Sequence, residues 1–109
     1  MISSVVVTGA GSGIGIDIVK RLSNESYHVF SCCRNNSKEL SAMSKKAKNI
    51  TILKFDLEDK SSIKSAVKEI FNYKEYRLFG LVNCAGVAQG GLFSMTPVEE
   101  IERIYKINY

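Results

Sequence analysis

A glycine-rich turn near the N-terminus has the residue types and the spacing of a phosphate-binding site. Residues 8–15 read TGAGSGIG, directly after the apolar run 5–7 and directly before a helical pattern. A strand that stops in a tight turn and restarts as a helix directs free backbone N–H groups and the positive helix end at one point. The turn is therefore predicted to bind a nucleotide pyrophosphate, and its candidate residues are Thr8, Gly9, Ser12, Gly13, Ile14 and Gly15.

Apolar and helical segments alternate around this turn. Strand-like runs rich in apolar and β-branched residues occur at 2–7, 28–33, 50–55 and 78–83. Helical apolar spacing fills the gaps between the first and second runs and between the third and fourth, and a weaker helical pattern lies within 35–48. Such alternation predicts an α/β fold of the Rossmann-like, doubly wound type, with about four parallel strands. A last helix is predicted to begin at the capping sequence Thr96-Pro97-Val98-Glu99.

Length and charge limit the classes of function. The 109 residues are enough for one domain, 1–109. Lys and Arg exceed Asp and Glu, which gives a formal net charge of +4, but the basic residues are spread along polar helix faces. Because they form no block with interleaved aromatic residues, nucleic acid is not an expected partner.

The cysteines and the N-terminus indicate the compartment. The cysteines Cys32, Cys33 and Cys84 lack CxxC spacing, and His28 has no set of ligands near it in sequence, so no metal site is predicted. Cys32 and Cys33 are expected to be small buried residues of a strand. The N-terminal apolar stretch is far shorter than the ~20 residues of a membrane span and follows no basic segment. We expect a cytoplasmic protein without membrane contacts.

The glycine spacing also carries a family resemblance. It departs from GxGxxG, whose third glycine would fall at Ile14, and instead gives TGxxxGxG with Gly9, Gly13 and Gly15. This spacing resembles that of the short-chain dehydrogenase/reductase family. In that family the first glycine makes the turn, the middle one lets the backbone approach the cofactor, and the third lets helix and strand pack closely. The resemblance implies that residues 1–109 form an NAD(P)-binding Rossmann-like domain.

The residues after the second run bear on which dinucleotide is bound. Family members that use NAD tend to carry, at the position of Cys33, an aspartate that holds the ribose hydroxyls and repels a 2′-phosphate. The next residue, Arg34, can pair with that phosphate in a charge-assisted contact worth about 1.5–3 kcal/mol. NADP is therefore favoured over NAD. One alternative stays open, namely that Arg34 is an ordinary solvated arginine. Ser12 favours this alternative, because NADP-using members often have a basic residue at that position.

Two further strand ends match the family. Asp56 and Leu57 resemble its Asp-apolar pair, whose side chain and backbone contact the adenine; alternatively, Asp56 only begins the turn toward the next helix. Residues 83–86 read NCAG and resemble its NNAG motif, with a cysteine in place of the second asparagine. The resemblance implies that Ala85 and Gly86 keep bulk away from the ribose, and that Asn83 joins neighbouring strands by hydrogen bonds. A plain strand-end turn is the alternative there.

The catalytic residues of the family are largely absent from this sequence. Asn108 stands where the family has a helix asparagine whose carbonyl holds a water in the proton relay, and it is the catalytic candidate. The family also uses a serine and a Tyr-x-x-x-Lys pair on one helix face. None of the five tyrosines has a lysine four residues later. We expect a truncated family member without its catalytic segment, and whether this chain is an enzyme stays open.

Two classes of function therefore remain. The first is the NADP(H)-binding part of a short-chain oxidoreductase that transfers hydride between a nicotinamide and a carbonyl or alcohol substrate. The second is a non-catalytic protein that binds a nucleotide, or a partner through an open sheet edge. The run 78–83 is apolar enough to be central yet is the last one present, so it predicts edge-strand association or a homo-oligomer. A remnant that does not fold is the third alternative.

Overall fold

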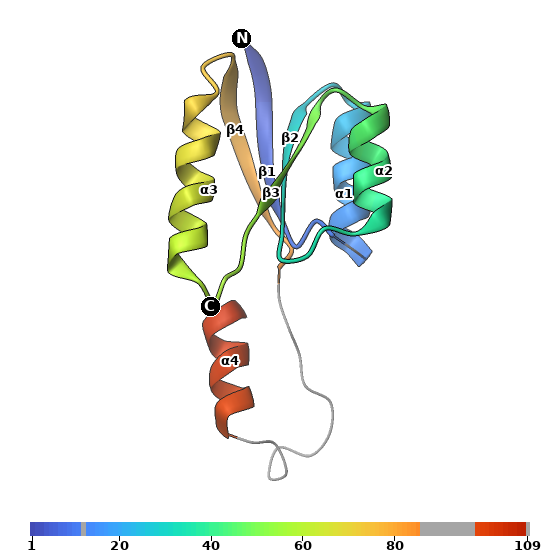
Figure 1. Ribbon diagram of the computed structural model, residues 1–109. Helices are drawn as coiled ribbons and strands as arrows, with labels where there is room; N and C mark the ends of the chain where they lie inside the picture. The colour runs from blue at the N-terminus through green and yellow to red at the C-terminus, as the bar shows by residue number, and fades with distance from the viewer. Residues whose placement is uncertain (12, 86–97, 109) are drawn as a thin grey trace.

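Four parallel strands form the centre of the structure, a computed structural model that describes residues 1–11, 13–85 and 98–108. They are β1 (Ile2–Thr8), β2 (His28–Cys33), β3 (Ile50–Lys54) and β4 (Tyr76–Asn83), and their order in the sheet is β3-β2-β1-β4. Helices cover both faces of this sheet (Figure 1). The predicted α/β fold with a parallel sheet of about four strands is confirmed.

The strand ends follow from pairing with neighbours. The predicted run 28–33 coincides with β2, whereas β1 continues to Thr8 and β4 begins two residues before the predicted run, at Tyr76. In the register, Tyr76 pairs with Ile2 and Thr8 pairs with Asn83. Polar residues can extend a strand where the backbone of a neighbouring strand supplies hydrogen bonds. An apolar sequence pattern does not predict such residues.

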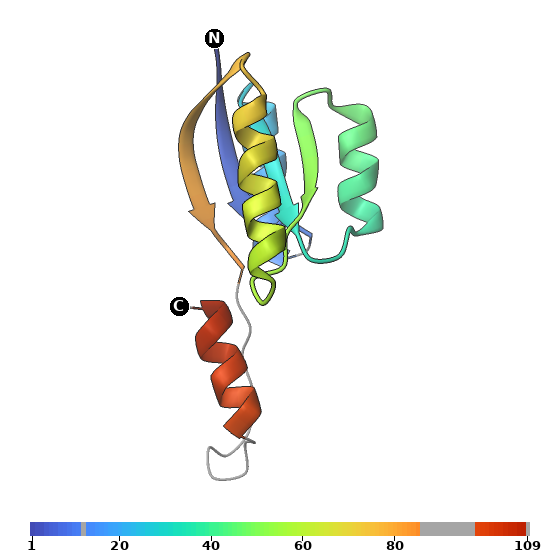
Figure 2. The same ribbon diagram turned by 60° about the vertical axis from the view of Figure 1, so that its left-hand side comes forward.

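The helices lie on opposite faces of the sheet. Helices α1 (Gly13–Asn24) and α2 (Lys38–Lys46) cover one face, and α3 (Lys60–Asn72) covers the other (Figures 1 and 2). The predicted helix within 35–48 is confirmed as α2, and the Ser37 side chain caps its start by accepting a hydrogen bond from the Leu40 amide at 3.1 Å. Asp59 caps α3 in the same way.

Alternation along the strands divides the core into two clusters. In β1, Val5 and Val7 face α1 and α2, whereas Val6 faces α3. The cluster under α3 is built around Phe30, which has no exposed surface. Cys32 and Cys33 are both buried, as expected, and burial raises the pKa of the Cys32 thiol to about 12.

Strand β4 lies at the edge of the sheet. Its only neighbour among the described strands is β1, and three of its apolar side chains are 44–61% exposed: Leu78, Phe79 and Leu81. The predicted edge position of this strand is confirmed.

The last helix, α4 (Val98–Asn108), projects beyond the carboxyl ends of the strands (Figure 1). Its C-terminal end approaches the loop between β3 and α3 (Figure 2). The predicted capping residues Thr96 and Pro97 lie outside the described residues.

Candidate functional site

The carboxyl ends of all four strands meet at one edge of the sheet, and the loops that follow them contact one another. The Ala10 amide donates to the Cys32 carbonyl at 3.1 Å, and the Phe55 amide donates to the Cys33 carbonyl at 3.0 Å. These bonds continue the strand pairing into the first residues of each loop. The predicted site residues after β1, β2 and β3 are therefore held side by side, as expected for ligand binding in a doubly wound sheet.

The glycine-rich turn needs glycine for two different reasons. Gly9 and Gly13 have φ angles of 64° and 58°, in the left-handed region that side chains disfavour. A Cβ on Gly9 would also lie 2.7 Å from the Ala85 amide nitrogen, and a Cβ on Gly15 would overlap the Gly9 carbonyl oxygen. At Gly13, by contrast, a Cβ would meet nothing within 4 Å, so the start of α1 opens onto free space. Backbone of this kind fits a pyrophosphate.

Thr8 joins this turn to the end of β4. Its hydroxyl accepts hydrogen bonds from the amides of Cys84 and Ala85, at 3.1 Å and 3.2 Å. The same hydroxyl donates to the Val82 carbonyl at 3.5 Å. Sequence reasoning included Thr8 as a site residue but missed this role, which depends on the pairing of β1 with β4. Thr8 thus ties β1 to the end of β4. The hydrogen bonds between strands that were predicted for Asn83 stay a prediction.

The end of β2 presents a neutral residue followed by a cation. The Cys33 side chain is 4% exposed, and burial raises the pKa of its thiol, so it carries no charge near neutral pH. Arg34 follows it and is 61% exposed. A depression of about 210 Å³ lies against these two residues and is also lined by Lys54 and Asn35. Sequence reasoning missed Lys54, a second cation that β2–β3 pairing places beside Cys33.

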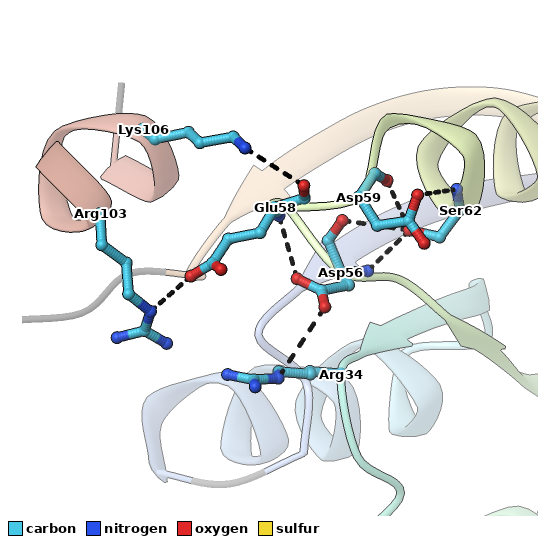
Figure 3. Close-up of polar contacts among 7 residues, drawn as sticks. All are labelled: Arg34, Asp56, Glu58, Asp59, Ser62, Arg103 and Lys106. Atoms are coloured by element: carbon cyan, nitrogen blue, oxygen red, sulfur yellow. Dashed lines mark hydrogen bonds and ion pairs between the residues drawn. The ribbon is translucent and has the colours of Figure 1, made fainter. Parts of the chain in front are cut away.

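The loop after β3 is organised by its own acidic residues. The Asp56 Oδ1 atom accepts from the Glu58 amide at 2.9 Å, and its Oδ2 atom lies 4.0 Å from Arg34 Nε (Figure 3). Ser62 closes the loop by accepting from the Asp56 amide at 3.0 Å. Asp56 therefore does begin the turn toward α3, and it also lies beside Arg34. Leu57 is half-buried and lines a groove between α3 and β4.

The remaining candidate residues differ in their position and burial. Asn83 is exposed at the end of β4, and Ala85 is half-buried against Gly9. Ile14 is largely exposed at the start of α1. Asn108 is the last residue of α4. Ser12 and Gly86 lie outside the described residues.

An apolar groove of about 560 Å³ separates α3 from β4. Val67 and Phe71 of α3 form one wall, and Leu78 and Leu81 of β4 form the other. Thr8 and Asn83 also line it, so the groove reaches the edge where the candidate residues lie.

Comparison with known proteins identifies the family. The sequence model of the family described as short chain dehydrogenase matches residues 3–109. The chain belongs to the short-chain dehydrogenase family. It is 40% identical over 89 residues to a 3-amino-tetrahydro-pyrrolizinone reductase of Xenorhabdus hominickii. The matched segment covers 77% of this chain and 28% of that protein. It is 34% identical over 104 residues to an NADPH-dependent 3-dehydrocapnine reductase of Ornithobacterium rhinotracheale, covering 94% of this chain and 37% of that protein.

Solved structures of short-chain dehydrogenases share the fold. An NADPH-bound carbonyl reductase from chicken fatty liver has a TM-score of 0.82 at 28% identity, over 96% of this chain and 42% of that one. An actinorhodin polyketide ketoreductase with NADPH has a TM-score of 0.84 at 28% identity, over 98% and 42%. The chain thus spans less than half the length of the relatives that it matches.

The described part of the chain has neither a cluster of metal ligands nor a membrane-spanning helix. It holds no group of three or more His, Cys, Asp or Glu side chains that could bind a metal ion. None of the helices in residues 1–11, 13–85 and 98–108 has the length and apolarity to span a bilayer.

Proposed function

We propose that residues 1–109 bind NADPH at the carboxyl edge of the sheet, as the cofactor-binding part of a short-chain oxidoreductase. The observation that carries the proposal is the end of β2, where a buried, uncharged Cys33 is followed by exposed Arg34, with Lys54 against the same depression. A 2′-phosphate there meets two cations and no carboxylate at the position of Cys33, which favours NADP over NAD. The NADPH-bound relatives of similar fold support this choice.

Each candidate residue has a proposed task in holding the dinucleotide. The pyrophosphate binds over Gly13 at the start of α1, with Thr8, Gly9, Ser12, Ile14 and Gly15 shaping the turn. Asp56 and Leu57 hold the adenine, and Ala85 and Gly86 keep bulk away from the ribose. Asn83 joins neighbouring strands by hydrogen bonds.

When bound, the reduced cofactor would donate hydride to a carbonyl substrate of the whole protein, and the oxidised cofactor would accept hydride from the corresponding alcohol. In the proposed proton relay, the backbone carbonyl of Asn108 holds a water molecule. The candidate residues named above hold the pyrophosphate and the adenosine, and through them they position the nicotinamide.

Calorimetric titration with NADPH and NADH tests the proposal on the wild-type chain and on Arg34→Ala. The wild-type chain is expected to bind NADPH about ten- to a hundredfold more tightly than NADH. Arg34→Ala is expected to lose that preference with little change in NADH affinity. Arg21→Ala is the matched control, because Arg21 is an exposed arginine of α1 paired with Glu25. An unchanged preference in Arg34→Ala, or no binding of either dinucleotide, contradicts the proposal.

A second candidate function is interaction through the edge of the sheet. The exposed apolar side chains Leu78, Phe79 and Leu81 of β4 favour it, and a second copy of the chain is the simplest partner. The cytoplasmic location and the absence of nucleic-acid and membrane partners also stay predictions.

A further inference from the structure

The loop between β3 and α3 carries three carboxylates, and each of them contacts a different part of the structure. Asp59 caps α3, and hydrogen bonds from the Ser61 hydroxyl and amide hold the pKa of its carboxyl below the usual range. Asp56 faces Arg34. The Glu58 side chain points the other way, toward α4, so it is required neither for the helix cap nor for the contact with Arg34 (Figure 3).

Two cations of α4 hold Glu58. Arg103 forms an ion pair with the Glu58 carboxylate, and Lys106 Nζ donates to the Glu58 backbone carbonyl at 3.3 Å (Figure 3). The Oε1 atom of Glu58 is buried, and the side chains of Glu58 and Arg103 are only about one third exposed. The surface pair Arg21–Glu25 is 79% and 54% exposed, so solvent screens it more strongly.

Glu58 also connects α4 to the proposed adenine site. Its amide donates to Asp56 Oδ1, while the other carboxylate oxygen of Asp56 faces Arg34. A ligand that orders Arg34 and Asp56 is therefore expected to order the backbone at Glu58, which is only two residues from Asp56. The Glu58 side chain and carbonyl then transmit that order to Arg103 and Lys106.

We propose that Glu58 is a positioning residue that fixes α4, and with it Asn108, to the loop that holds the adenine. Cofactor bound at Arg34 and Asp56 thereby stabilises α4 without touching it. This inference rests on the proposed binding of NADPH, and it adds a residue that acts through Arg103 and Lys106 rather than on the cofactor itself.

Amide hydrogen exchange followed by mass spectrometry tests the inference on the whole 109-residue chain, with and without saturating NADPH. Without cofactor, Glu58→Gln is expected to speed exchange in peptides from α4 about fivefold relative to wild type. With NADPH, exchange in α4 slows in the wild-type chain but not in Glu58→Gln, although the turn around Gly9 and Gly13 is protected in both. Arg103→Gln tests the same pair from the helix side, without altering the loop.

Glu102→Gln is the matched control, because it removes a carboxylate from the exposed face of the same helix, beyond its first turn. A charge exchange, Glu58→Arg with Arg103→Glu, is expected to restore part of the protection of α4. Equal exchange of α4 in wild type and Glu58→Gln overturns the inference. So does loss of protection at the glycine-rich turn in Glu58→Gln, because Glu58 would then act on binding itself. If NADPH protects no turn even in the wild-type chain, the proposed function fails, and the comparison without cofactor still decides whether Glu58 holds α4.

Discussion

Strands β2 and β4 have similar apolar character but opposite burial. All six residues of β2 are buried, because β1 and β3 flank it and helices cover both of its faces. In β4 the described structure places a neighbour on one side only, and Leu78, Phe79 and Leu81 are largely exposed. Apolar composition predicts that a segment is a strand, but its burial depends on its place in the sheet.

The difference separates two kinds of surface. The proposed cofactor site is centred where β1, β2 and β3 end, around the fully buried strand β2. A packed scaffold holds backbone amides and Arg34 in fixed positions, as binding of a dinucleotide requires. The β4 side instead presents an apolar groove and an unpaired edge, which suits association with another protein surface.

Truncating one aromatic side chain in each strand tests whether β2 and β4 differ in their contribution to stability. Phe30→Ala is expected to lower the free energy of unfolding by about 3–5 kcal/mol, because Phe30 is fully buried under α3. Phe79→Ala is expected to lower it by less than about 1 kcal/mol, since that ring is 61% exposed. Urea denaturation of the three proteins measures the difference. Equal losses would show that β4 is packed as tightly as β2.

A charge on the edge strand tests whether that surface associates. Leu81→Lys is expected to weaken self-association of the chain about tenfold, because a lysine on an edge strand opposes pairing with a second copy. Sedimentation equilibrium over a range of protein concentrations measures this. Ser65→Lys, at an exposed position of α3, is the control with the same added charge. A monomeric wild-type chain at all concentrations would exclude the edge as a self-association surface.

A small dependence of stability on pH is expected from the contact between β2 and β4. The His28 ring of β2 stacks on the Tyr76 ring of β4, with centroids 3.9 Å apart, and its Nε2 atom is hydrogen-bonded to Thr51 Oγ1. Burial lowers the pKa of His28 below its ordinary value of 6.5, although the charge of Glu75 acts in the opposite direction. The unfolded chain therefore binds a proton more readily than the folded one.

The contribution of neutral His28 to the free energy of unfolding should therefore be fully present above pH 6.5. It should decrease as the pH drops from 6.5 to the lowered pKa of His28 in the folded state. Below that pKa the contribution of His28 no longer changes. Urea denaturation from pH 7.5 to pH 5 measures the loss, and His28→Gln is expected to give a flatter profile. Identical pH profiles for the two proteins would show that His28 is not the group responsible.

Local sequence patterns predicted the strands and helices, but they did not predict contacts between residues that are far apart in the sequence. The apolar runs located all four strands, and the helical pattern within 35–48 located α2. The role of Thr8 depends on amides 76 and 77 residues later in the chain. The contact of Glu58 with Arg103 and Lys106 likewise depends on where α4 lies. No spacing within either segment encodes such a contact, because it arises only when the strands are ordered in the sheet.

Titration of the ¹⁵N-labelled chain with NADPH, followed through its amide resonances, tests whether the dinucleotide binds at the carboxyl edge of the sheet. We expect the largest shifts at Gly9, Gly13, Arg34 and Asp56, with smaller ones in α4 and none along β4 from Leu78 to Leu81. Shifts confined to the groove between α3 and β4, or no shifts at millimolar NADPH, would contradict a dinucleotide site at the carboxyl edge of the sheet.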